Sequence, residues 1–156
     1  MLRDDITRAM KESMKSGDKV ATSALRLILA ALKDREIAAR GKGGDESDGG
    51  ISDQEILSVL QTMVRQRNDS IEMYEKGGRD DLVEQEKREI EIIQSFLPQQ
   101  MSAEEIAAAV AAVIADTGAS GLKDMGKAMG ALRERHAGCM DFGAASALLK
   151  EKLNAG

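Results

Sequence analysis

The sequence is nearly devoid of aromatic side chains, with one Tyr, two Phe and no Trp among 156 residues. Apolar residues nevertheless make up 42% of the chain. A core must therefore be built from Leu, Ile, Val, Met and Ala, a mixture typical of packed helices rather than of aromatic-rich sheets. Proline is also scarce, and Pro98 is the only one, so most of the chain can continue as helix without interruption. We therefore predict an all-α protein.

Side chains that could build a conventional active site or metal centre are almost missing, because the chain has one His and one Cys. A single Cys139 excludes an intramolecular disulfide and fits a reducing compartment, and zinc-binding spacing is absent. We interpret His136 as a solvated residue at a helix C-terminus, and Cys139 as an ordinary loop thiol. No phosphate-binding Gly-x-x-x-x-Gly-Lys-Ser/Thr motif occurs. The expectation is no catalytic residue, no cofactor and no bound metal.

Long apolar runs and a leader segment are absent as well. No stretch approaches about 18 apolar residues, and no charged-then-apolar N-terminal segment precedes a cleavage site. We therefore expect a soluble, cytoplasmic protein without membrane contact. The net charge of −5 argues against general affinity for polyanions, so any nucleic-acid contact must come from a local patch.

The hydrophobic periodicity predicts seven amphipathic helices. They are expected at residues 2–16, 19–40, 53–76, 80–97, 102–117, 122–136 and 142–153. Residues 41–50 contain five Gly and no apolar side chain, which predicts a flexible surface loop. Because proline disfavours helix at the residue before it, we expect a four-helix domain over residues 1–97 and a three-helix domain over 98–156.

Capping signals support these boundaries. Ser52 and Ser102 each begin a capping box that ends on a Glu three residues later, and an apolar residue on either side of each box predicts a hydrophobic staple. The two staples are Ile51 with Ile56, and Met101 with Ile106. We also expect Asp80 or Asp81 to cap the fourth helix, and Asp141 to cap the last one.

Two stretches contain more specific polar and charged residues than helix packing requires. Arg26 lies in the apolar run 20–32, where a charge must either be paired or extend outward to solvent. We expect it to bond a Glu of a neighbouring helix, because buried charges are normally paired. Arg65 and Arg67 belong to a polar run at 65–70. A solvated helix face explains that run, and an edge that contacts phosphates is the alternative.

A third stretch combines glycines with lysines at 121–132. Gly126 and Gly130 lie four residues apart on one helix face, where each costs about 1 kcal/mol relative to Ala. Close approach of another helix is the simpler explanation, because small residues permit backbone contact. The alternative is close approach of a polyanionic backbone, which Lys123, Lys127 and the helix N-terminus would then face.

Taken together and in order, several motifs resemble the YqeY family over nearly the whole chain. The first motif is Leu25-Arg26-Leu27 through Lys33-Asp34-Arg35-Glu36-Ile37. The middle one is Gly78-Arg79-Asp80-Asp81-Leu82 with Glu89-Ile90 and Phe96-Leu97-Pro98-Gln99-Gln100. The last is Lys123-Asp124-Met125-Gly126-Lys127-Ala128-Met129-Gly130. One segment departs from the pattern: many relatives carry a Gly-Arg-Ala-Asp-Gly-like turn before the last helix. Here that segment is Gly138-Cys139-Met140-Asp141-Phe142-Gly143, without the arginine.

The YqeY family is similar to the C-terminal helical region of GatB, the B subunit of the glutamine-dependent aminoacyl-tRNA amidotransferase. That enzyme converts misacylated Glu-tRNA or Asp-tRNA to the Gln or Asn form, and its helical tail contacts tRNA. The resemblance thus implies a helical domain before Pro98 and a GatB-tail-like three-helix domain after it.

The function expected from this resemblance is that of a non-catalytic tRNA- or RNA-binding accessory module. The candidate contact residues are Lys123, Lys127, Arg65 and Arg67. Residues 98–156 carry six Lys+Arg against seven Asp+Glu, so binding should be weak and steeply salt-dependent. One alternative is an adaptor that docks on an amidotransferase or synthetase. Another is a carbon–nitrogen ligase component with glutamine as amide donor, the activity that the family label implies.

Overall fold

The structure is a computed structural model that describes residues 2–40 and 50–155, and every regular element in these ranges is helical. The elements are α1 (Leu2–Ser16), α2 (Lys19–Arg40), α3 (Asp53–Lys76), α4 (Asp80–Gln94), α5 (Ala103–Thr117), the short 3-10 helix η1 (Leu122–Asp124), α6 (Met125–His136) and α7 (Phe142–Ala155). The predicted all-α class is confirmed. The predicted loop at 41–50 lies outside the described residues except for Gly50.

The chain divides into two compact units, unit 1 (Met1–Leu97) and unit 2 (Pro98–Gly156). The division follows the end of α4 rather than coinciding with it. Instead of continuing to Leu97 as predicted, α4 ends at Gln94, and the last residues form a hydrogen-bonded turn in which Leu97 N donates to Gln94 O at 3.0 Å. The residue before a proline is disfavoured in helix, which accounts for an early end.

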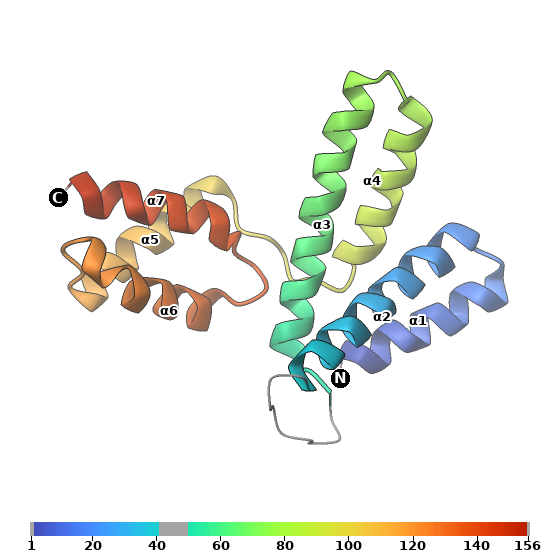
Figure 1. Cartoon of the computed structure of the whole chain (residues 1–156), viewed down its shortest axis with the longest axis horizontal. Helices are drawn as coiled ribbons and strands as arrows, with labels where there is room; N and C mark the ends of the chain where they lie inside the picture. The colour runs from blue at the N-terminus through green and yellow to red at the C-terminus, as the bar shows by residue number, and fades with distance from the viewer. Residues whose placement is uncertain (1, 41–49, 156) are drawn as a thin grey trace. The chain divides into compact units, whose positions relative to one another are not determined.

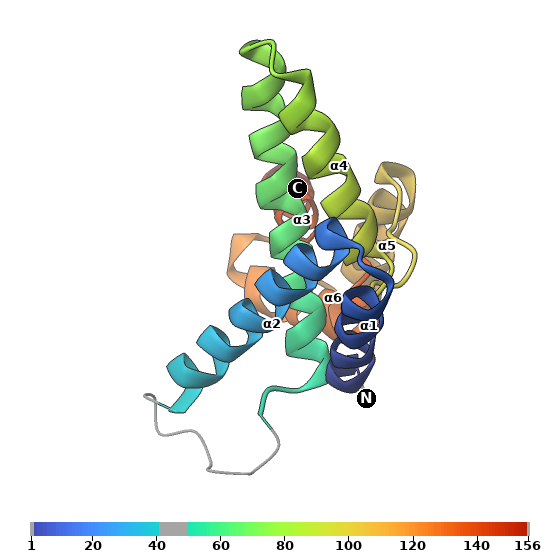
Figure 2. The same cartoon turned by 90° about the vertical axis from the view of Figure 1, so that its right-hand side faces the viewer.

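Unit 1 consists of two helical hairpins (Figure 1). Gly17 joins α1 to α2, and Gly78 lies in the turn from α3 to α4, with φ of +76° and +70°. α2 packs against α4, and both α1 and α2 contact α3. The buried side chains that join the hairpins are Ile6, Leu25, Ile28, Leu32, Ile51, Ile56, Leu60 and Ile93. The turn between α3 and α4 projects away from the α1–α2 hairpin in both views (Figures 1 and 2), so the outer half of this hairpin packs mainly on itself.

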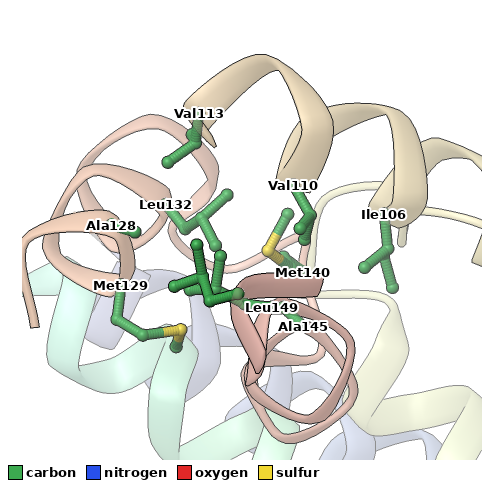
Figure 3. Close-up of a cluster of buried hydrophobic side chains, with 10 residues drawn as sticks. Ile106, Val110, Val113, Ala128, Met129, Leu132, Met140, Ala145 and Leu149 are labelled. Atoms are coloured by element: carbon green, nitrogen blue, oxygen red, sulfur yellow. The ribbon is translucent and has the colours of Figure 1, made fainter. Parts of the chain in front are cut away.

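Unit 2 is a three-helix bundle around its own core. Buried side chains from α5, α6 and α7 point toward one another (Figure 3). Met140, which lies in the α6–α7 connection, is also fully buried there. The segment that enters the unit is bonded to the same connection: Gln100 Nε2 donates to Gly138 O at 2.7 Å, and Met101 N donates to Cys139 O at 2.8 Å.

The predicted caps are confirmed at three of the four helices. Ser102 and Glu105 form the complete capping box of α5, and the Ser52 side chain accepts a bond from Glu55 N at the start of α3. Asp141 Oδ1 accepts bonds from Gly143 N and Ala144 N in the first turn of α7. The residues of both predicted staples lie in or against the cores: Ile51 and Ile56 belong to that of unit 1, and Ile106 belongs to that of unit 2, against which Met101 packs.

The predicted cap of α4 is wrong, because Arg79 occupies the cap position and its side chain makes no capping bond. Asp80 and Asp81 lie in the first turn instead, where their charges complement the helix dipole. Asp81 also forms an ion pair with Arg79 at 3.2 Å.

No single helix among the described residues is long and apolar enough to cross a membrane. α5 and the segment Leu122–His136 meet the criterion of length and composition only as a pair, and that pair bends by 97° at its break. The apolar stripes of both segments, including Val110, Val113 and Leu132, are buried in the core of unit 2.

Candidate nucleic-acid interface

Lys123 and Lys127 lie about one helical turn apart, where η1 continues into α6. Both side chains are exposed. Lys127 Nζ donates to the Thr117 carbonyl at 3.4 Å, at the C-terminal end of α5. A cation near these last carbonyls also complements the dipole of α5. The fold therefore places both lysines on the outer surface of unit 2.

Gly126 and Gly130 are exposed on the surface of α6. A Cβ atom added to either glycine would meet no atom within 4 Å outside its own helix backbone and chain neighbours, among the residues that the structure describes. The simpler interpretation, that these glycines permit close approach of another helix, is therefore wrong for the helices of unit 2. The core of unit 2 is instead contacted by Ala128, Met129 and Leu132.

Arg133 is a further cation on this surface that the sequence analysis did not select. It is exposed and lies three residues after Gly130, so it shares a helix face with the two glycines. The spacing from Gly130 was the signal that could have found it. We call the surface of Lys123, Gly126, Lys127, Gly130 and Arg133 the α6 face.

Carboxylates lie both beside and on the α6 face, where Glu134 follows Gly130 by four residues. Asp124 Oδ2 accepts a bond from Ser120 N at 2.9 Å. This bond, together with the nearby charges of Lys123 and Lys127, lowers the pKa of Asp124, so that its side chain stays ionised at neutral pH. Glu134 follows Arg133 and is exposed. The surface is thus a mixed patch whose cations flank the two glycines.

The structure gives Arg65 and Arg67 different environments on α3. Arg65 is exposed. Arg67 Nη1 lies 3.5 Å from Glu86 Oε2 and 3.4 Å from Glu89 Oε2, and its side chain is only 15% exposed. The two carboxylates of α4 therefore account for Arg67 within unit 1, and Arg65 remains the accessible cation of the pair.

The cluster of Arg67, Glu86 and Glu89 is tightly enclosed, with side chains of the two glutamates 17% and 7% exposed. Burial raises the pKa of Glu86, the charge of Glu89 raises it further, and Arg67 opposes both effects. Arg67 Nε and Glu86 Oε2 are buried without a hydrogen-bond partner among the described residues. One guanidinium thus balances two carboxylates.

The expected ion pair between Arg26 and a glutamate of a neighbouring helix is not formed. Arg26 is exposed, and its Nη2 lies 3.9 Å from Met14 Sδ. Glu36, from the same sequence motif, pairs with Arg3 of α1 instead. Arg26 escapes burial because it lies on the side of α2 that faces away from the core of unit 1.

His136 and Cys139 show no catalytic arrangement with each other. Cys139 Sγ donates to the backbone carbonyl of His136 at 3.3 Å, and both side chains are half-buried. Across the described ranges no group of three or more His, Cys, Asp or Glu side chains is placed to hold a metal ion.

A comparison with protein families settles the affiliation of the chain. The family model described as Yqey-like protein matches residues 3–153. The chain belongs to the YqeY-like family. Its motifs at Leu25–Ile37, Gly78–Gln100 and Lys123–Gly130 all lie within the matched range.

Relatives of this YqeY-like protein include yeast proteins named altered inheritance of mitochondria protein 41, mitochondrial. The sequence from Lachancea thermotolerans is 35% identical over 95 residues, covering 61% of this chain and 47% of the relative. The Candida glabrata sequence is 33% identical over 94 residues, covering 60% and 48%. A Saccharomyces cerevisiae sequence is 33% identical over 90 residues, covering 58% and 45%. The alignments thus span about half the length of these relatives, whose names place them in mitochondria.

Proposed function

We propose that this YqeY-like protein is a non-catalytic tRNA-binding accessory module and that the α6 face contacts the RNA backbone. The observation that carries the proposal is the pair of exposed glycines, Gly126 and Gly130, with open space in front of both. No other helix of unit 2 packs closely on either glycine, so packing within this unit does not explain their helix cost of about 1 kcal/mol each. A ligand that approaches the helix backbone would account for them.

The chemistry of the α6 face suits a phosphate backbone. Because glycine has no side chain, an RNA strand can come close to the helix backbone at Gly126 and Gly130. Lys123, Lys127 and Arg133 can neutralise the phosphates on either side. Few cations and two neighbouring carboxylates keep the attraction small. Affinity should therefore be modest and fall steeply with salt.

Removing the two lysines is expected to weaken tRNA binding and to flatten its salt dependence. The double variant Lys123→Ala, Lys127→Ala should reduce the slope of log affinity against log salt by about two, because each phosphate-contacting lysine contributes about one. Gel shifts or fluorescence anisotropy with total tRNA from about 20 to 200 mM salt would measure the slope.

The matched control is Lys150→Ala, Lys152→Ala, which removes the same charge from exposed positions on α7 in the same unit. It should leave most of the slope in place. An equal loss in both double variants would point to a general charge effect. No shift with the unaltered protein at micromolar concentration and low salt would remove the proposal.

Replacing both glycines with alanine is expected to change stability and binding in opposite directions. Because the added methyl groups meet open space, Gly126→Ala with Gly130→Ala should stabilise unit 2 by about 1–2 kcal/mol through helix propensity. The same methyl groups should hinder the approach of the RNA backbone and reduce affinity. Thermal unfolding and anisotropy on the same samples would check both; a stabilised variant with unchanged affinity would contradict the assignment of the α6 face.

A further inference from the structure

A groove between α1 and α2 in unit 1 combines apolar walls with positive charge. It has a volume of about 630 Å³, and Met14, Thr22, Leu27 and Ala30 are among its lining residues. Lys19 and Arg26 are the two charged residues in the lining, which contains no carboxylate. The groove is thus positively charged, although the whole chain has a net charge of −5.

The nearby acidic side chains are directed elsewhere. Asp18 precedes Lys19, but it pairs with Arg88 of α4 and accepts a bond from Ala21 N. Asp18 and Glu12 line a separate depression on the other side of the hairpin. The guanidinium of Arg26 therefore faces the groove without a carboxylate partner in the described ranges, and Met14 Sδ lies 3.9 Å from it.

The groove continues along one exposed face of α2. Ser23, Leu27, Ala30, Asp34 and Ile37 recur at helical spacing on this side. Leu27 and Ile37 are 48% and 54% exposed, and Met14 at the groove is 47% exposed, so three of the five large exposed apolar side chains among the described residues gather here. The part of α2 that lines the groove, from Lys19 to Ala30, extends over about 16 Å, enough for about three turns of a second helix, and Asp34 lies beyond it on the same face.

We infer that the α1–α2 groove is a docking site for an acidic amphipathic helix of a partner protein. Leucine-like anchors would pack on Met14 and Leu27, as in other helix-in-groove complexes, and carboxylates beside them would pair with Lys19 and Arg26. Charge complementarity selects this occupant, because Lys19 and Arg26, which have no carboxylate partner among the described residues, would repel a basic helix and would gain no counter-charge from a neutral one. The apolar contacts that Met14 and Leu27 offer suit a helix better than a phosphate backbone. This inference concerns unit 1 and is independent of tRNA binding by the α6 face.

Three labelled helical peptides of equal length provide the probe. Each carries leucines at i, i+4, i+7 and i+11, with the flanking positions filled by Glu, Gln or Lys. Fluorescence anisotropy with the full chain should show the acidic peptide binding about tenfold or more tighter than the neutral one, and the basic peptide weakest. Leu27→Asp should reduce binding of the acidic peptide by about tenfold or more.

A charge exchange gives the sharper test. Lys19→Glu with Arg26→Glu should reverse the order, so that the basic peptide binds best. Both residues are exposed, so these variants should keep the fold, which circular dichroism would verify. The matched controls are Met73→Asp and Arg65→Glu, also at exposed positions in unit 1, and they should leave the order unchanged.

Other occupants give different results. Equal affinity for all three peptides, or no binding of the acidic peptide at about 1 mM, would overturn the inference. Self-association that Leu27→Asp abolishes would assign the groove to a second copy of the chain instead. In tRNA gel shifts Leu27→Asp should behave like the unaltered protein; a loss of RNA binding there would also overturn it, without bearing on the α6 face.

Discussion

Replacing Arg67 with methionine is expected to destabilise unit 1 by about 3 kcal/mol at pH 7, because it removes the cation that pairs with two enclosed carboxylates. Glu86 and Glu89 would lose the charge that now lies 3.5 and 3.4 Å from them. Each would then be left close to a like charge, with little solvent to screen the two. Methionine keeps the volume of the side-chain stem, so packing changes contribute little.

Acid should relieve the defect of this variant. In the unaltered protein the pKa of Glu86 is already raised by burial and by Glu89, so the folded state binds a proton more readily than the unfolded chain does. A raised carboxyl pKa costs stability above that pKa, and the cost disappears as the pH falls through it. Without Arg67 the pKa rises further. The stability gap between Arg67→Met and the unaltered protein should therefore shrink between pH 7 and about pH 4.5.

Arg65→Met is the matched control, since Arg65 is exposed one half-turn away on the same helix, and its loss should change stability by less than about 0.5 kcal/mol. Hydrogen exchange of the α3 and α4 amides at pH 7 and near pH 4.5 would report on this hairpin separately from unit 2. Equal effects of the two substitutions, or a gap that widens in acid, would contradict the assigned role of the cluster.

Leu132→Ala is expected to unfold unit 2 while unit 1 stays folded. Leu132 is fully buried at the centre of the bundle, and truncation of such a leucine costs about 2–5 kcal/mol. The core of a three-helix unit of this size rarely supplies more than about 3–5 kcal/mol of stability. The single substitution thus removes most of the margin of one unit.

Leu122→Ala removes the same atoms from a side chain that is 47% exposed and should leave unit 2 folded. Hydrogen exchange resolved by peptide would show α5, α6 and α7 losing protection in Leu132→Ala, while α1–α4 keep theirs. If protection fell in both units together, the units would not be independent folding bodies. Leu132→Ala should also lose tRNA binding and keep its binding to the acidic peptide, because the two proposed surfaces lie in different units.

Features determined by local chemistry could be predicted from the sequence. The capping box at Ser102 and the cap at Asp141 each need only a few neighbouring residues, and both are found in the structure. The all-α class follows similarly from helical periodicity with a single proline. The start of α4 could not be predicted in this way, because Asp80 and Asp81 both resemble N-cap residues. Arg79 occupies the N-cap position instead.

The environments of the candidate site residues depend on which helices become neighbours, and periodicity does not state that. Arg26 and Arg67 both lie in helical runs. The sequence pattern predicts a glutamate partner for Arg26, but it is Arg67 that has one. Arg67 faces α4 and is paired, whereas Arg26 faces away from the core and is not. The open space in front of Gly126 and Gly130 likewise depends on the packing of unit 2, because the opposite side of α6 is the one that contacts α5 and α7.

The hydrogen bonds from Gln100 and Met101 to the α6–α7 connection also determine how unit 2 bears mechanical load. A pull on the chain from Pro98 reaches these two bonds before it reaches the first turn of α5. Because Gly138 and Cys139 directly precede the buried Met140, the two bonds tie the entering segment to a connection that is anchored in the core. Tension applied at the start of the unit is therefore shared from the outset by segments almost forty residues apart in the sequence.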